Sequence, residues 1–189
     1  MGMADRLLVE AAGRNPGPWE QHSRYVAMAA RAIAESTADL NPEKAYVLGL
    51  LHDIGRRFGK GHLQHVYDGY HYLLDLGYPE AAKIALTHSF NLKALKDYIG
   101  KFDISEEKQK ELEELLEAAT LDDYDLLIQL CDSVATGEGI VSLEERMQDV
   151  KSRYGYYPQE KWDRNMELKA YFEEKTGRNL YDIVDHLNA

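Results

Sequence analysis

Leu50-Leu51-His52-Asp53-Ile54-Gly55 is the stretch on which the fold of this chain depends. It ends a helix that Asn41-Pro42 opens, because a capping side chain is followed there by a proline suited to the first turn. His52 comes four residues after Leu48, so the two share one face of that helix. The stretch therefore places a polar doublet at the end of an apolar helix.

Helical periodicity continues on both sides of this stretch. Apolar residues recur at helical spacing from Trp19 to Ala34, and proline, serine and glycine positions mark the ends of further helices. The expected helices after residue 55 cover about 65–76, 79–88, 105–119, 121–135, 142 onward, 158–177 and 180–187. No segment alternates convincingly with period two, so the sequence predicts an all-α protein built as a helical bundle.

Length and composition suit a single core. The chain has 189 residues, of which 44% are hydrophobic and 29% charged. We expect one domain over residues 1–139 and a C-terminal helical extension over residues 140–189 packed on it. No apolar run approaches the roughly 20 residues that span a bilayer, and no secretion signal is visible. Cys131 is the single cysteine, which excludes an internal disulfide framework. These features predict a cytoplasmic protein with no membrane partner.

The net charge of −11 argues against duplex nucleic acid as a partner. A small phosphorylated substrate stays compatible with this charge, because a bound metal supplies local positive charge. The sequence leaves the oligomeric state open, and a homodimer is compatible with it on general grounds.

Further polar residues lie on apolar helix faces. His22 and His88 have apolar neighbours three and four positions away, and Asp132 follows Ile128 by four. A lone histidine on such a face is usually a hydrogen-bonded core residue, and Asp132 alone is explained by a salt bridge or a helix-end hydrogen bond. A buried carboxylate is costly without a cation, however, so a metal shared by these residues and His52 is the simpler account. Imidazole together with carboxylate suits Zn, Mn, Fe, Co or Ni.

The order of these residues resembles the HD superfamily of metal-dependent phosphohydrolases. The resemblance rests on His22 in a helix and on the His52-Asp53 doublet, which apolar residues precede and Ile54-Gly55 follows. It also rests on the segment Leu127-Ile128-Gln129-Leu130-Cys131-Asp132-Ser133. It covers about residues 19–136. It implies an all-α HD-domain bundle in which His22, His52, Asp53 and Asp132 bind a divalent cation.

An extended form of this pattern implies a second metal. His88 and His65 resemble the additional ligands of dinuclear relatives, in which the aspartate of the doublet bridges the two ions. The expected cofactor is therefore one or two divalent ions, drawn from Mn, Fe, Co, Ni, Mg and Zn. Asp53, as a ligand that orients the attacking water, is the expected catalytic residue.

The resemblance implies hydrolysis of a nucleotide or another small phosphoester. A bound cation would lower the pKa of a coordinated water from about 15.7 toward neutrality and neutralise charge on the phosphoryl oxygens. Arg56, Arg57 and Lys60 follow the doublet and are candidates for contacting the substrate phosphate. A solvated basic loop is the alternative explanation of these three residues.

Two other functions stay open at this point. Some members of the superfamily hold two irons with the same kind of ligand set and use oxygen to cleave carbon–carbon or carbon–phosphorus bonds. A non-catalytic, metal-stabilised module that binds a partner or a nucleotide is the other alternative. The acidic helix at residues 106–117 and the tyrosines 154, 156 and 157 would supply its surface.

Overall fold

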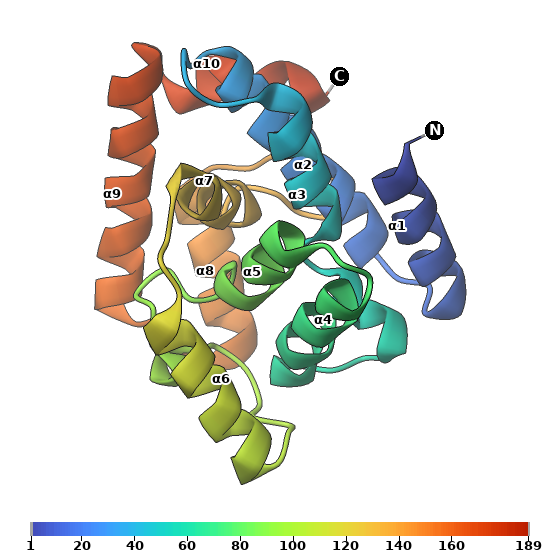
Figure 1. Cartoon of the computed structure of the whole chain (residues 1–189). Helices are drawn as coiled ribbons and strands as arrows, with labels where there is room; N and C mark the ends of the chain where they lie inside the picture. Colours follow the sequence, from blue (N-terminus) through green and yellow to red (C-terminus); the bar gives the residue numbers. More distant parts are fainter. Residues whose placement is uncertain (1, 189) are drawn as a thin grey trace.

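The computed structural model describes residues 2–188 and is built from α-helices and short 3-10 helices (Figure 1). In chain order these are α1 (Met3–Arg14), α2 (Trp19–Glu35), α3 (Pro42–Leu51), η1 (Ile54–Phe58), α4 (Leu63–Asp75), α5 (Pro79–Thr87), η2 (Leu95–Asp97), α6 (Glu106–Ala118), α7 (Asp123–Asp132), α8 (Leu143–Tyr154), α9 (Gln159–Thr176), α10 (Leu180–Val184) and η3 (Asp185–Asn188). Between residues 2 and 188 no β-strand forms, although an isolated antiparallel bridge joins Ala135 to Ile140. The expected all-α fold is confirmed.

Side-chain caps explain where the expected helices begin. The Asn41 side chain accepts a hydrogen bond from the Lys44 backbone N–H at the start of α3. At the start of α8, Ser142 and Glu145 form a capping box. Such caps satisfy N–H groups that the helix itself leaves without partners, so they fix the first turn.

Helix α1 is missing from the helices that the sequence predicts. Its N-cap is Gly2, which makes no side-chain cap hydrogen bond. Its buried face is formed largely by small residues, and α1 packs against α2, α3 and η1. Tertiary contact therefore supports this helix, and no local start signal announces it.

Two glycines allow the central elements to approach closely. A Cβ atom at Gly49 of α3 would lie only 2.6 Å from the Cα of Ala27 in α2. A Cβ at Gly55 of η1 would overlap the carbonyl oxygen of His65 and press on Gly69 of α4. Larger residues would force these backbones apart. Gly55, which follows the His-Asp doublet, therefore allows η1 to pack directly against α4.

The C-terminal helices complete the main core. Buried apolar residues of α8, α9 and α10 belong to the same cluster as those of α1 to α5 and α7: Leu143, Met147, Leu168, Phe172, Leu180, Ile183 and Val184. Helix α9 lies beside α7 and α8, and α10 packs on α2 (Figure 1). The extension expected for residues 140–189 thus shares one core with the rest of the chain.

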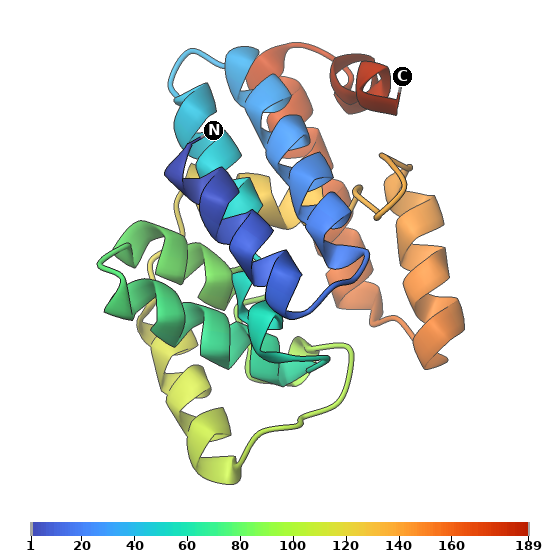
Figure 2. The same ribbon diagram turned by 90° about the vertical axis from the view of Figure 1, so that its right-hand side faces the viewer.

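A smaller apolar cluster joins α4, α5 and α6. It contains the side chains of Leu63, Val66, Leu86, Phe90, Leu95, Tyr98, Leu112 and Leu116. Figure 2 shows these three helices gathered at the end of the molecule opposite α10. Among residues 2–188, no helix combines the length and the apolar character that crossing a membrane requires.

Candidate metal centre

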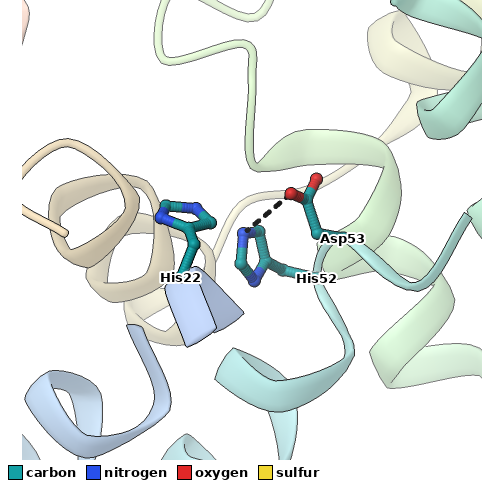
Figure 3. Close-up of side chains that lie close together, drawn as sticks. All are labelled: His22, His52 and Asp53. Carbon is teal, nitrogen blue, oxygen red and sulfur yellow. Dashed lines mark ion pairs between the residues drawn. The ribbon is translucent and has the colours of Figure 1, made fainter. Parts of the chain in front are cut away.

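Six histidine and aspartate side chains from five helices meet at one place. They are His22 in the first turn of α2, His52 and Asp53 after α3, His65 in α4, His88 after α5 and Asp132 at the end of α7. Three overlapping sets have ligand atoms within 4.8 Å of one another: His22–His52–Asp53, His52–His88–Asp132 and Asp53–His65–His88. Figure 3 shows the first of these sets, with both imidazole rings close to the Asp53 carboxylate.

The first half of the cluster brings together histidine and aspartate atoms at distances suited to a shared cation. His22 Nε2 lies 2.9 Å from Asp132 Oδ1, and His52 Nε2 lies 3.8 Å from the same oxygen. His52 Nε2 is 4.0 Å from Asp53 Oδ2. Ligands about 2.1 Å from one cation are separated by about 3 to 4 Å, so these spacings fit.

The second half of the cluster surrounds the other oxygen of Asp53. Asp53 Oδ1 lies 3.1 Å from His65 Nε2 and 3.5 Å from His88 Nε2, and those two nitrogens are 3.3 Å apart. The two oxygens of Asp53 therefore face different histidines, so Asp53 would contribute a ligand atom to each of two cation sites.

Backbone hydrogen bonds turn three of the histidines toward the centre. His52 Nδ1 lies 2.7 Å from the Gly49 carbonyl, and His88 Nδ1 lies 2.9 Å from the Ala85 carbonyl. His65 Nδ1 makes the same kind of bond to its neighbour His62. A ring that donates its Nδ1 proton carries its lone pair on Nε2, which is how metal-ligating histidines are usually fixed.

One atom in particular fits a metal ligand. His52 is 1% exposed, and its Nε2 has no hydrogen-bond partner within the part of the chain that the structure describes. Buried polar atoms are normally paired, so this atom requires an explanation that a bound cation supplies.

Burial keeps two of the histidines neutral. It lowers the pKa of His52 to about 4, against the opposing pull of Asp53, and it lowers the pKa of His65 with help from Arg56. At neutral pH both rings therefore have a lone pair to offer.

The carboxylates are ionised for a different reason. Burial alone would raise the pKa of Asp53, but Arg56 and His65 outweigh it and hold that pKa well below its usual range. Burial is likewise outweighed at Asp132, whose pKa is lowered chiefly by the hydrogen bond with His22. Neutral imidazoles with ionised carboxylates form the donor set of a divalent cation.

The three basic residues after the doublet occupy different places. Arg56 lines the cavity over the cluster and donates from Nε to Asp53 Oδ2 at 2.6 Å. Arg57 is buried away from that cavity, where it bonds Glu10 and stacks on the ring of Tyr72 at 4.1 Å. Its position argues against the phosphate contact expected from the sequence. Lys60 is exposed and lines an adjoining cavity that Arg56 also borders.

The cavity over the cluster has a volume of about 560 Å³, and part of its wall is not predicted from the sequence, which indicates Tyr154 only as a surface residue of the non-catalytic alternative. Tyr98 lies on it, and helix α8 adds Arg146, Asp149, Arg153 and Tyr154. Arg146 and Arg153 are seven residues apart and so share a helix face, which is the one local signal available. Nothing in the sequence connects that face to the cluster, because the connection depends on how α8 packs.

Comparison with known proteins assigns the family. The profile of the HD domain matches residues 19–137, more than half of the chain. The chain therefore belongs to the HD-domain family, whose members bind divalent metals. Among solved structures, the HD domain of the phosphodiesterase PgpH from L. monocytogenes aligns with a TM-score of 0.47 and 15% identity, covering 86% of this chain and 94% of that one. No curated protein matches the chain.

Proposed function

We propose that the chain is a metal-dependent phosphohydrolase acting on a nucleotide or another small phosphoester. The observation that carries the proposal is the floor of the cavity, where buried imidazole nitrogens and two carboxylates converge beneath three arginines. His22, His52, Asp53 and Asp132 would hold one cation, and His65 and His88 together with Asp53 would hold a second. A divalent cation at this place would acidify a coordinated water and neutralise charge on phosphoryl oxygens.

Asp53 is central to the proposed chemistry. It is 3% exposed and ionised, and its oxygens face both histidine sets, so it can orient a water for attack. Arg56 holds this carboxylate by a short charge-assisted hydrogen bond. Arg56 is thus a positioning residue for Asp53.

Other residues on the cavity wall suit the handling of phosphate. Arg146 and Arg153 face the same space from α8, where they share one carboxylate, Asp149, so the group carries a net positive charge that would meet phosphoryl oxygens. Burial raises the pKa of Tyr98, so its phenol keeps its proton and can donate a hydrogen bond into the cavity. These groups favour a substrate with negative charge at its reacting end.

The test is phosphate release from a panel of nucleotides and small phosphoesters, with Mn, Mg, Co, Ni and Fe supplied separately. We expect release that needs both a metal and Asp53, so Asp53→Ala loses it. His71→Ala is the matched control, because His71 lies on the outer side of α4 against Glu111 and keeps the site intact. No release with any metal, together with oxygen uptake by the iron form, would overturn the proposal in favour of a di-iron oxygenase.

A further inference from the structure

A second cavity of about 140 Å³ lies beside the metal centre, toward the C-terminal helices. We name it the inner chamber. It shares His88, Asp132 and Arg146 with the larger cavity, so a ligand can extend from one space into the other. The rest of its wall mixes apolar side chains, such as Met147 and Val150, with the polar side chains of Asn91, Gln129, Ser133, Tyr157 and Lys161.

Buried polar atoms on this wall are left unused by the fold. Gln129, 1% exposed, donates from Nε2 to the Thr87 carbonyl at 3.0 Å, yet its Oε1 has no partner among residues 2–188. Asn91, 6% exposed, donates to Asn165 Oδ1 at 2.7 Å, and its own Oδ1 is also unpaired there. Both unpaired atoms are amide oxygens, which accept hydrogen bonds, so a water or a ligand hydroxyl is expected against them and the anion itself is left to the cationic side of the wall.

Lys161 gives the inner chamber its charge. Its ammonium donates to the Ser89 carbonyl at 2.8 Å, and no carboxylate of the described chain forms an ion pair with it. Burial lowers the pKa of Lys161 to about 8, while Asp132 and Asp97 act on it only through space. An ammonium has three donors and one is taken, so this half-buried cation lacks an anion.

No other charged group on the wall supplies a counter-ion for Lys161. Arg146 also lies on the wall, but its guanidinium is ion-paired with Asp149 at 3.2 Å, and only its Nε has no hydrogen-bond partner within residues 2–188. Asp132 is the acid on the wall, but its Oδ1 is bonded to His22 at the metal centre. We infer that the inner chamber binds a second oxyanionic group, a phosphate or a carboxylate, of the phosphoester whose reacting phosphate lies over the metal cluster. This inference rests on the proposed function and names its substrate class.

Non-hydrolysable phosphonates test the inference by binding alone. Isothermal titration of the Mn-loaded protein compares propylphosphonate with 3-phosphonopropionate and ethane-1,2-diphosphonate, which carry a second anion at the same spacing, and with their longer homologues. We expect the best dianionic ligand to bind about tenfold or more tightly than its alkyl counterpart, as a charge-assisted contact provides. If 3-phosphonopropionate binds more tightly than ethane-1,2-diphosphonate, the second anionic group of the substrate is a carboxylate. If the diphosphonate binds more tightly, that group is a phosphate.

Two variants assign any preference to the inner chamber. Lys161→Gln should bring the ratio of affinities close to one while leaving propylphosphonate binding unchanged, and Lys161→Arg should restore the preference. If the natural chain binds the alkyl and the dianionic phosphonates equally well, the inference is wrong. It is also wrong if the preference for the dianionic ligands persists in Lys161→Gln. Neither result contradicts the proposed phosphohydrolase function. If no phosphonate binds the metal-loaded protein at all, the proposed function fails and the inference fails with it.

Discussion

The metal centre and the inner chamber share a wall, yet they hold their polar groups in opposite ways. In the metal centre most side chains hold one another: Asp132 bonds His22, and Asp53 bonds Arg56 and lies against His65, so that His52 Nε2 is the one buried polar atom of the cluster that lacks a hydrogen-bond partner among the described residues. In the inner chamber Lys161 and two amide oxygens have no such partners within the described residues. A cluster that is already paired keeps its geometry without a ligand, whereas unpaired groups gain most when one arrives.

The residues that form the two regions also lie in different parts of the sequence. Every candidate ligand lies between residues 22 and 132, inside the segment that matches the HD domain. The cations of the inner chamber lie in α8 and α9, beyond that segment. We therefore expect changes in the first region to abolish activity and changes in the second to alter substrate preference.

The largest effect is expected from His52→Ala. The variant removes a buried ring whose Nε2 is aimed at both carboxylates, so metal retention and turnover should be lost together. The loss should exceed the 10- to 100-fold typical of residues behind the ligands, and reach about a thousand-fold or more. Metal content after gel filtration and kcat/KM measure it, with His71→Ala as the control. A folded, metal-free variant with normal turnover would remove the basis of the proposed function.

Arg56→Ala should have the next largest effect. Without its bond to Asp53 Oδ2 we expect metal affinity and kcat/KM to fall by about 10- to 100-fold. Arg56 is the strongest of the groups that lower the pKa of Asp53, so that pKa should rise in the variant. The carboxylate is then protonated at higher pH, and the acid limb of the activity profile moves upward. A profile that keeps its acid limb would show that Arg56 does not control Asp53.

The sequence locates the ligand cluster because its signals are local. Helical spacing places His22 and Asp132 on inward faces, and the first-turn prolines that open α3 and α5 decide where His52 and His88 fall. Four residues that helical spacing selects, His22, His52, His88 and Asp132, lie together in the structure, and Asp53 and His65, which the family resemblance added, lie with them.

The position of Lys161 in the inner chamber cannot be predicted from local signals in the sequence. Lys161 lies in a helix rich in charges of both signs, which is the pattern of a solvated face. It comes to line a cavity only because α9 packs against α7. Contacts between helices distant in sequence decide its environment, and no local pattern reports them.

Lys161→Met should stabilise the protein while it weakens the inner chamber. The usual lysine pKa of 10.5 falls to about 8 here, so the unfolded chain binds more protons between these values and the natural protein gains stability as pH rises through them. The cost of the buried charge at pH 7 has an upper bound of about 3 kcal/mol, and we expect Lys161→Met to recover about 1 to 2 kcal/mol.

Urea denaturation of the natural chain and the variant at pH 7 and near pH 10 measures this gain. The difference between them should shrink at the higher pH, where the lysine has lost its proton in the folded state. A variant that is less stable at pH 7 would mean that Lys161 already has a compensating partner. The inner chamber would then resemble the metal centre instead of contrasting with it.

Arg57→Ala is expected to have the smallest effect on activity, although Arg57 directly follows Arg56. Successive residues of a 3-10 helix point about 120° apart, so the two guanidinium groups face different sides of η1. Arg57 ties η1 to α1 through Glu10 and covers the ring of Tyr72. Its removal should cost about 1 to 2 kcal/mol of unfolding free energy and leave kcat/KM within about twofold. A large loss of activity in stable Arg57→Ala protein would place the phosphate contact where the sequence pattern first suggested it, and would extend the functional region to the α1 side of η1.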